Sequence, residues 1–247
     1  VHDIPDWLEP LLRQSLGADF AGVMQAMQAR APVYLRVNPA RGDRAQAMAL
    51  LAADGITARP CDALPLALEL TGGERRLRAS KAYLSGAVEL QDLSSQAVVA
   101  ALPLKDGMRV LDHCAGGGGK TLAMAAQAKL KLFAHDAAPR RMADLPARAA
   151  RAGIKVTLTE RPEAKAPFDL ILVDAPCSGS GSWRRDPEGK WRLDPSRLEE
   201  LTRLQAAILD RAAPMVAEGG WLAYATCSYL RPENQDQAQG FLARHAD

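Results

Sequence analysis

The sequence has 247 residues, of which 48% are hydrophobic and 24% charged, with a formal net charge of +2. This composition is typical of a soluble globular protein with room for two domains, and the balanced charge neither requires nor excludes nucleic acid. No apolar run approaches the roughly 20 residues of a membrane span, and the first residues lack the basic and apolar regions of a signal peptide. We therefore expect a cytoplasmic protein without membrane contact.

The cysteines Cys61, Cys114, Cys177 and Cys227 are far apart in the sequence. None pairs with another at the Cys-x-x-Cys spacing of zinc sites, and the pattern is not that of a secreted disulfide framework. We expect free thiols and no bound metal.

Residues 1–85 predict a small α+β domain. Apolar residues recur at helical spacing from 5 to 29 around a break at Gly17, which predicts two short helices. A strand at 32–38, a helix at 44–53 and a strand at 56–59 follow. A basic run near the end of this domain is more typical of a solvated surface than of a ligand site, although it is suited to a phosphate backbone. This run comprises Arg75, Arg76, Arg78 and Lys81.

Residues 86–247, beyond a boundary placed near Ser85, alternate strands with helices, which predicts a doubly wound parallel sheet. The strand Arg109–Asp112 leads to four consecutive glycines, Gly116–Gly119, and a helix begins at once after them. Backbone without side chains at a strand's carboxyl end is suited to a small ligand. We interpret this stretch as a nucleotide-type cofactor loop, because a flexible linker fits its context poorly and a Walker loop has a different glycine spacing.

An acid or a thiol stands at the end of each predicted strand of this sheet: Asp112, Asp136, Glu160, Asp174 and Cys227. Right-handed crossovers would place these strand ends along one crevice, so we expect a ligand site there. Asp136 lies about 20 residues after the glycine loop, where an acid accepts hydrogen bonds from a ribose diol. NAD and S-adenosylmethionine both carry such a ribose.

Two of the thiols discriminate between these cofactors. Cys177 lies in Asp-Ala-Pro-Cys-Ser-Gly and Cys227 in Ala-Thr-Cys-Ser. A single cysteine is commonly a small buried hydrophobe, but two at adjacent strand ends favour catalysis. Hydride transfer needs no cysteine nucleophile. Methylation of a pyrimidine at carbon 5 needs a thiolate that adds to carbon 6 and an acid that protonates ring nitrogen 3.

On these motifs the sequence resembles the Sun (Fmu) type of RNA 5-methylcytosine methyltransferase, whose bacterial members modify small-subunit ribosomal RNA. The matching stretches extend over nearly the whole chain: Leu35–Asn38, Gln91–Gln96, Cys114–Thr121, Asp174–Gly181 and Ala225–Ser228. The resemblance implies a Rossmann-like class I methyltransferase sheet in residues 86–247 behind the small domain of residues 1–85. It also implies an RNA cytosine-5 methyltransferase with S-adenosylmethionine as cofactor and ribosomal RNA as partner, which we expect to be monomeric.

The resemblance also implies roles for individual residues. Cys227 would be the nucleophile, Cys177 would assist product release, and Asp174 would complete the catalytic set. The implied contacts of S-adenosylmethionine are Cys114, Ala115, Gly116, Gly117, Gly118, Gly119, Lys120, Asp136, Glu160 and Asp174. DNA cytosine methyltransferases instead use the Pro-Cys thiol as nucleophile, and the Thr-Cys-Ser motif argues against that assignment here.

The sequence departs from this family pattern at several places. Gly117 stands where many members have proline, and Glu160 replaces the usual aspartate in a shortened loop. Bacterial relatives often carry an additional N-terminal helical RNA-binding domain, which we do not find in this sequence. The sheet of such enzymes normally continues for two more strands after the one that ends at Thr226, so we expect truncated C-terminal strands and an exposed edge.

The segment 183–192 combines two tryptophans with basic residues, a pattern that favours a polyanion, since arginines hold phosphates and indoles stack on unpaired bases. An alternative is a surface loop whose tryptophans pack inward. Two other functions stay open: an RNA-binding ribosome assembly factor that retains the pocket without turnover, and a methyltransferase that acts on a protein or a small molecule.

Overall fold

The computed structural model describes residues 2–246. The chain divides into two compact units. The first unit joins the residues up to Ala31 with Val173–Met215 and the residues from Leu222 onward, and the second consists of Pro32–Leu172 and Val216–Trp221. This division differs from the predicted boundary near Ser85, because the two N-terminal helices group with the C-terminal elements.

The second unit contains a small antiparallel sheet with the strand order β2-β3-β1-β4. Its strands are β1 (Val33–Val37), β2 (Thr57–Pro60), β3 (Ala67–Gly72) and β4 (Val88–Leu90). On β1, Leu35 lies opposite Leu68 of β3 and Leu90 of β4. Two of the strands, β3 and β4, were not predicted, and β4 follows the expected boundary because it completes this sheet.

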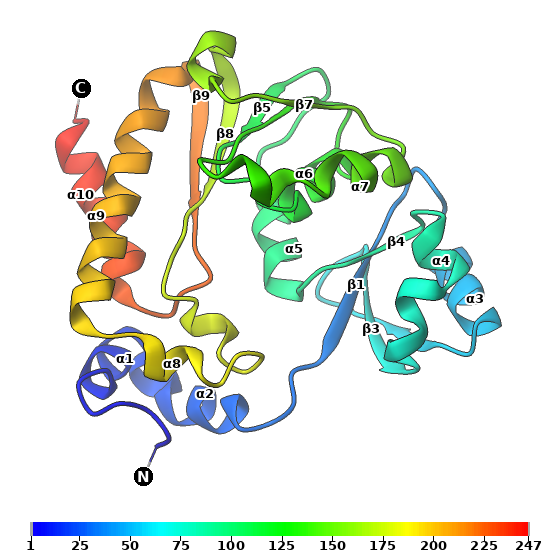
Figure 1. The fold of residues 1–247 in the computed structure, drawn as a ribbon, viewed down its shortest axis with the longest axis horizontal. Coiled ribbons are helices and arrows are strands. Elements are labelled where there is room, and N and C mark those ends of the chain that lie inside the picture. Colours follow the sequence, from blue (N-terminus) through cyan, green and yellow to red (C-terminus); the bar gives the residue numbers. More distant parts are fainter. Residues whose placement is uncertain (1, 247) are drawn as a thin grey trace. The chain divides into compact units, whose positions relative to one another are not determined.

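Helices α3 (Arg44–Ala53) and α4 (Lys81–Leu84) belong to the same unit as the small sheet and lie next to it (Figure 1). Asp43 begins α3 with a capping box, since its carboxylate accepts from Gln46 N while the Gln46 side chain accepts from Asp43 N. Leu51 of α3 is fully buried with Leu35 and Leu68 of the sheet. The predicted helix at 44–53 is confirmed.

The larger sheet of the second unit has the order β7-β6-β5-β8-β9, and the pairs β5–β6, β5–β8 and β6–β7 are parallel. Its strands are β5 (Arg109–Asp112), β6 (Lys131–Ala134), β7 (Val156–Leu158), β8 (Phe168–Asp174) and β9 (Val216–Ala225). Their side chains are apolar on both faces in the centre, as in Val110 and Leu111, because helices flank parallel sheets. The predicted Rossmann-like sheet is confirmed. Beyond Leu172, β8 passes from the second unit to the first, and so does β9 beyond Trp221.

Helices α5 (Leu93–Ala100), α6 (Gly119–Ala125) and α7 (Leu145–Ala152) belong to this unit. The cluster that joins α6 and α7 to β6 contains Ala115, Leu122, Ala134, Met142, Leu145 and Ala149. Leu145 is fully buried, and burial of a leucine side chain stabilises the fold by about 1.5–3 kcal/mol. The glycine loop therefore rests on a packed core.

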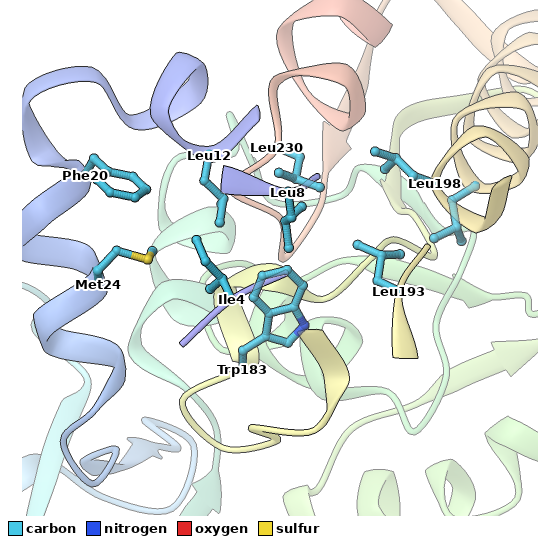
Figure 2. Packing of buried hydrophobic residues seen from close by; sticks show 10 residues of the cluster. Ile4, Leu8, Leu12, Phe20, Met24, Trp183, Leu193, Leu198 and Leu230 are labelled. Carbon is cyan, nitrogen blue, oxygen red and sulfur yellow. The ribbon is translucent and has the colours of Figure 1, made fainter. Parts of the chain in front are cut away.

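The first unit is mainly helical, with α1 (Glu9–Leu16), α2 (Phe20–Met27), α8 (Gly189–Arg192), α9 (Pro195–Ala212) and α10 (Gln235–Arg244). Asp194 caps α9 by accepting from Arg197 N at 2.8 Å, and α9 packs beside α10 (Figure 1). Figure 2 shows the buried cluster of this unit, in which the indole of Trp183 lies among Ile4, Leu8 and Leu193. No helix within residues 2–246 has the length and apolarity needed to span a membrane.

Candidate active site

The glycine loop follows β5 and ends at the start of α6. Gly116 and Gly118 have positive φ angles of 50° and 79°, which side chains other than glycine adopt at a cost. A Cβ on Gly118 would also lie 2.2 Å from Leu145 Cδ1. Gly117 does not have a positive φ, and a Cβ added there would lie 3.0 Å from Arg148 Nη1.

The two buried acids at the ends of β5 and β6 organise this loop. Asp136 accepts from Gly116 N at 3.0 Å and from Ala138 N at 2.9 Å. Asp112 accepts from the Thr121 hydroxyl of α6 at 2.6 Å. Arg141 Nη1 also pairs with Asp136 Oδ2 at 3.4 Å. A carboxylate has about four acceptor sites, so Asp136 keeps capacity for a ligand hydroxyl beside these partners.

A chain of buried side chains connects the small sheet to the loop within the second unit. Arg36 of β1 donates to Gln91 Oε1 at 2.7 Å, and Gln91 Nε2 donates to Gly119 O at 3.1 Å. Burial lowers the pKa of Arg36 to about 10. Arg36 and Gln91, which come from separate stretches of the sequence, thus connect the small sheet to the end of the glycine loop.

The other residues implied to contact S-adenosylmethionine in this unit differ in exposure. Ala115 is buried, Cys114 and Lys120 are half-buried, and Glu160 is exposed two residues beyond the end of β7. Because β5, β6 and β7 are adjacent and parallel, Asp112, Asp136 and Glu160 follow strands that end at the same edge. Their roles as cofactor ligands stay predictions.

The first unit holds the two catalytic candidates. Cys177 Sγ and Cys227 Sγ are 3.3 Å apart, with Cys177 half-buried and Cys227 exposed. Gly181 N donates to Cys227 O at 2.8 Å, and a Cβ on Gly181 would meet that oxygen at 2.9 Å, so the close approach of the two loops requires glycine there. Two thiols 50 residues apart in the sequence are thereby brought together.

The two thiols are chemically unequal. A hydrogen bond with Cys227, together with burial, raises the pKa of Cys177 well above its ordinary value. Cys177 therefore keeps its proton in this pair, whereas Cys227 is the thiol exposed to solvent. A thiolate is the nucleophilic form of cysteine.

Asp174, half-buried at the end of β8, belongs to the same unit as the thiols, whereas the glycine loop belongs to the other. The catalytic candidates Cys177, Cys227 and Asp174 therefore form within one unit, and the glycine loop forms within the other. The prediction that all five strand ends share one crevice stays a prediction.

Sequence reasoning overlooked Glu233, which is fully buried and accepts hydrogen bonds from Ser178 and Ser228, the residues that follow the two thiols. In the sequence, Glu233 lies just before α10 and is indistinguishable from an ordinary acidic residue at the start of a helix. Only the tertiary structure distinguishes it from such an acid.

The basic-aromatic segment 183–192 is corrected in part. Trp183 is only 3% exposed and packs in the core, so it does not present an indole for stacking, whereas Trp191 is 57% exposed. Arg184 donates to the carbonyl oxygens of Ala29 and Arg30 at 2.9 and 2.8 Å. Lys190 pairs with Asp3, and Arg192 pairs with Asp186. Trp183, Arg184 and Lys190 therefore serve the fold of the first unit, whereas Trp191 and Arg192 are exposed.

Arg75, Arg76, Arg78 and Lys81 of the other basic cluster are all exposed. They lie on a 3-10 helical turn, Glu74–Ala79, and at the start of α4. Within residues 2–246, no group of three or more acidic, histidine or cysteine side chains is arranged to hold a metal ion.

A parallel sheet with a glycine loop after its central strand and buried acids at two neighbouring strand ends defines a Rossmann-like methyltransferase. The family profile described as 16S rRNA methyltransferase RsmB/F matches residues 99–247, and the ferredoxin-like domain profile of the same family matches residues 4–75. The chain belongs to the RsmB/F family of 16S rRNA methyltransferases.

Individual relatives agree with this assignment. A ribosomal RNA small subunit methyltransferase B from Citrobacter koseri is 35% identical over 98% of this chain and 58% of that protein. The crystal structure of PH0851 has a TM-score of 0.92 at 30% identity, over 99% of this chain and 57% of that one. A methyltransferase homolog from Pyrococcus horikoshii has a TM-score of 0.81 at 25% identity, over 97% and 78% of the two chains. The chain thus spans 58% of the Citrobacter relative's length.

Proposed function

We propose that this chain carries the catalytic part of an S-adenosylmethionine-dependent 16S rRNA cytosine-5 methyltransferase that acts through a covalent adduct between Cys227 and the pyrimidine. The observation that carries this proposal is the pair of thiols 3.3 Å apart, one exposed and one held protonated. Methylation of an exocyclic nitrogen or a ribose hydroxyl needs no such pair. Carbon 5 of cytosine becomes nucleophilic only after a thiolate adds to carbon 6.

The difference in exposure and pKa between the two thiols suits them to two successive steps, attack on carbon 6 by Cys227 and later removal of the carbon 5 proton by Cys177. Cys227 adds to carbon 6 as a thiolate, and carbon 5 then takes a methyl group. When the Cys227 sulfur is bound to carbon, it no longer shares a proton with Cys177, and the main cause of the raised Cys177 pKa is removed. Cys177 then releases its own proton to water, and the resulting thiolate accepts the carbon 5 proton, either directly or through a water. The carbon–sulfur bond to Cys227 breaks as the aromatic ring forms again.

The second unit suits S-adenosylmethionine, which supplies an electrophilic methyl group when bound. The positive φ angles of Gly116 and Gly118 leave backbone open for close approach, and a Cβ at Gly118 would collide with the core. Asp136 is buried beside the loop with acceptor capacity for a ribose diol. We assign Asp174 to the protonation of ring nitrogen 3, because cytosine must gain a proton there as the thiolate adds.

The competing function is a ribosome assembly factor that binds RNA without turnover, and the intact thiol pair argues against it. The deciding experiment incubates the chain with 16S rRNA and S-adenosylmethionine carrying a labelled methyl group, and then digests the RNA to nucleosides. Label in 5-methylcytidine supports the proposal. RNA binding without any labelled nucleoside favours the assembly factor, and label in another nucleoside refutes the cytosine-5 assignment.

The cofactor prediction is that S-adenosylmethionine and its demethylated product bind, whereas NAD does not. Asp136→Ala should weaken S-adenosylmethionine binding by about 1–3 kcal/mol, because the ribose hydroxyls lose a charged acceptor. Isothermal titration calorimetry measures both effects, and Asp62→Ala, which removes an exposed carboxylate of the same unit, serves as the control. Heat from NAD together with none from S-adenosylmethionine would refute the prediction.

The RNA prediction concerns the exposed arginines Arg75, Arg76 and Arg78. Their combined reversal to glutamate should weaken RNA binding and flatten its salt dependence, since the logarithmic slope decreases by about 0.7–0.9 for each phosphate that the protein no longer neutralises. Filter binding at several salt concentrations measures the slope. The control makes the same charge change on exposed residues of α9, Arg197, Arg203 and Arg211. Equal effects of both triple variants would show that net charge, and not this cluster, attracts the RNA.

A further inference from the structure

A single buried carboxylate lies beneath both thiol loops of the first unit. Glu233 ends a 3-10 helical turn, Arg231–Glu233, and is fully buried. Its Oε1 accepts from Ser178 N at 2.8 Å and from Gln205 Nε2 at 3.0 Å. Its Oε2 accepts from the hydroxyls of Ser178 and Ser228, each at 2.5 Å. These four bonds fill the roughly four acceptor sites of a carboxylate.

The hydrogen-bonded serines are the chain neighbours of the thiols, since Ser178 follows Cys177 and Ser228 follows Cys227. We propose that Glu233 is the positioning residue that holds Cys177 and Cys227 at reacting distance, an inference that rests on the proposed function of the two thiols. Oxygens of one side chain connect two loops that are far apart in the sequence.

Glu233 is itself fixed to the body of the unit. The Tyr224 hydroxyl donates to Glu233 O at 2.7 Å. The neighbouring Asn234 side chain donates to the carbonyl oxygens of Ser228 and Leu230 at 2.9 and 3.0 Å. Leu230 is fully buried in the core cluster (Figure 2). Because the Glu233 carboxylate is fixed to the core and bonded to both loops, it holds the two loops in place.

The chemistry of this position favours positioning over simple space filling. Burial of a carboxylate costs several kcal/mol before compensation, and an apolar side chain of similar volume often stabilises a core better. Charge-assisted O–H···O bonds at 2.5 Å are short and directional, so they fix the hydroxyls and, through the backbone, the adjacent cysteines. A misplacement of reacting groups by about 1 Å can cost about a factor of 10².

The equilibrium between the two thiols and glutathione disulfide measures their positions without any methyl transfer. One glutathione disulfide oxidises the two thiols to a Cys177–Cys227 disulfide and is itself reduced to two glutathione thiols, so atoms and electrons balance. The equilibrium constant of this exchange is an effective concentration of one thiol at the other. It falls when the loops separate.

Glu233→Ala should lower this effective concentration by about 10- to 100-fold, the range expected for a displacement near 1 Å. Glu233→Gln and Ser228→Ala should give smaller decreases, because each keeps part of the network. Glu199→Gln is the matched control, since Glu199 forms an exposed pair with Arg203 of the same helix. It should leave the equilibrium constant unchanged.

Far-UV circular dichroism and thermal unfolding identify the folded variants, and Glu233→Gln and Ser228→Ala carry the test if Glu233→Ala does not fold. A merely structural Glu233 predicts lower melting temperatures with an unchanged thiol equilibrium in folded protein, and that result would overturn the proposal. In methyl transfer assays the positioning role predicts a lower kcat at an unchanged KM for S-adenosylmethionine. If the unmodified chain methylates no RNA, the proposed function fails, while the thiol equilibrium still tests the positioning.

Discussion

Cys227→Ala is expected to abolish methyl transfer to RNA and to prevent any covalent protein–RNA adduct, because no other group makes carbon 5 of cytosine nucleophilic. Cys177→Ala is expected to behave differently. It keeps the exposed nucleophile, so it should attack and methylate, but it lacks the thiol that helps to remove the carbon 5 proton. The adduct should accumulate.

Denaturing electrophoresis after incubation with RNA and S-adenosylmethionine detects this adduct as a slowly migrating band. The band should form with Cys177→Ala and be absent from the double variant that also lacks Cys227. Cys61→Ala is the control, since Cys61 is a half-buried thiol of the other unit. If the band formed with Cys227→Ala and vanished with Cys177→Ala, the nucleophile would be Cys177, as in the DNA enzymes.

Gly118→Ala is expected to weaken S-adenosylmethionine binding and to destabilise the second unit. The left-handed backbone costs an alanine about 1–2 kcal/mol, and overpacking against the fully buried Leu145 adds about 1–3 kcal/mol. A shift of the loop that relieves the collision also moves its backbone donors. We expect binding to weaken about tenfold or more, the factor that corresponds to about 1.4 kcal/mol.

Gly107→Ala is the matched control, because Gly107 has a φ of 88° but no atom within 4 Å of its added Cβ. It should lower the stability by the backbone term alone and leave cofactor affinity unchanged. Chemical denaturation gives the stability of each variant and calorimetry gives the affinity. Equal affinity losses for both variants would mean that backbone strain, and not the collision with Leu145, determines the loop's function.

Local chemistry made several elements predictable from sequence. The helix at 44–53 has an Asp43 cap and ends before Asp54-Gly55, and the strand at 109–112 is an apolar run that ends in an acid. Both have the predicted bounds. The loop after this strand was predictable as well, because only glycine supplies left-handed backbone without a side-chain penalty.

Elements that depend on distant partners were not predictable in the same way. Strand β4 has only three residues and exists because β1 pairs with it. Trp183 lies in a segment whose composition suggests RNA contact, yet residues near the N-terminus bury it. Neither the pairing nor the burial has a periodic signal along the chain.

The sequence by itself determined the kinds of groups available: a glycine loop, acids at strand ends and two motif cysteines. These follow from residue type and local spacing. The tertiary structure alone decided that Cys177 and Cys227 touch, that Cys177 keeps its proton, and that Glu233 holds both loops. The physical reason is that contact, burial and pKa arise from atoms brought together in space: Cys177 and Cys227 are 50 residues apart in the chain, and Ser178 and Glu233 are 55 apart, and chain spacing carries no information about such distances.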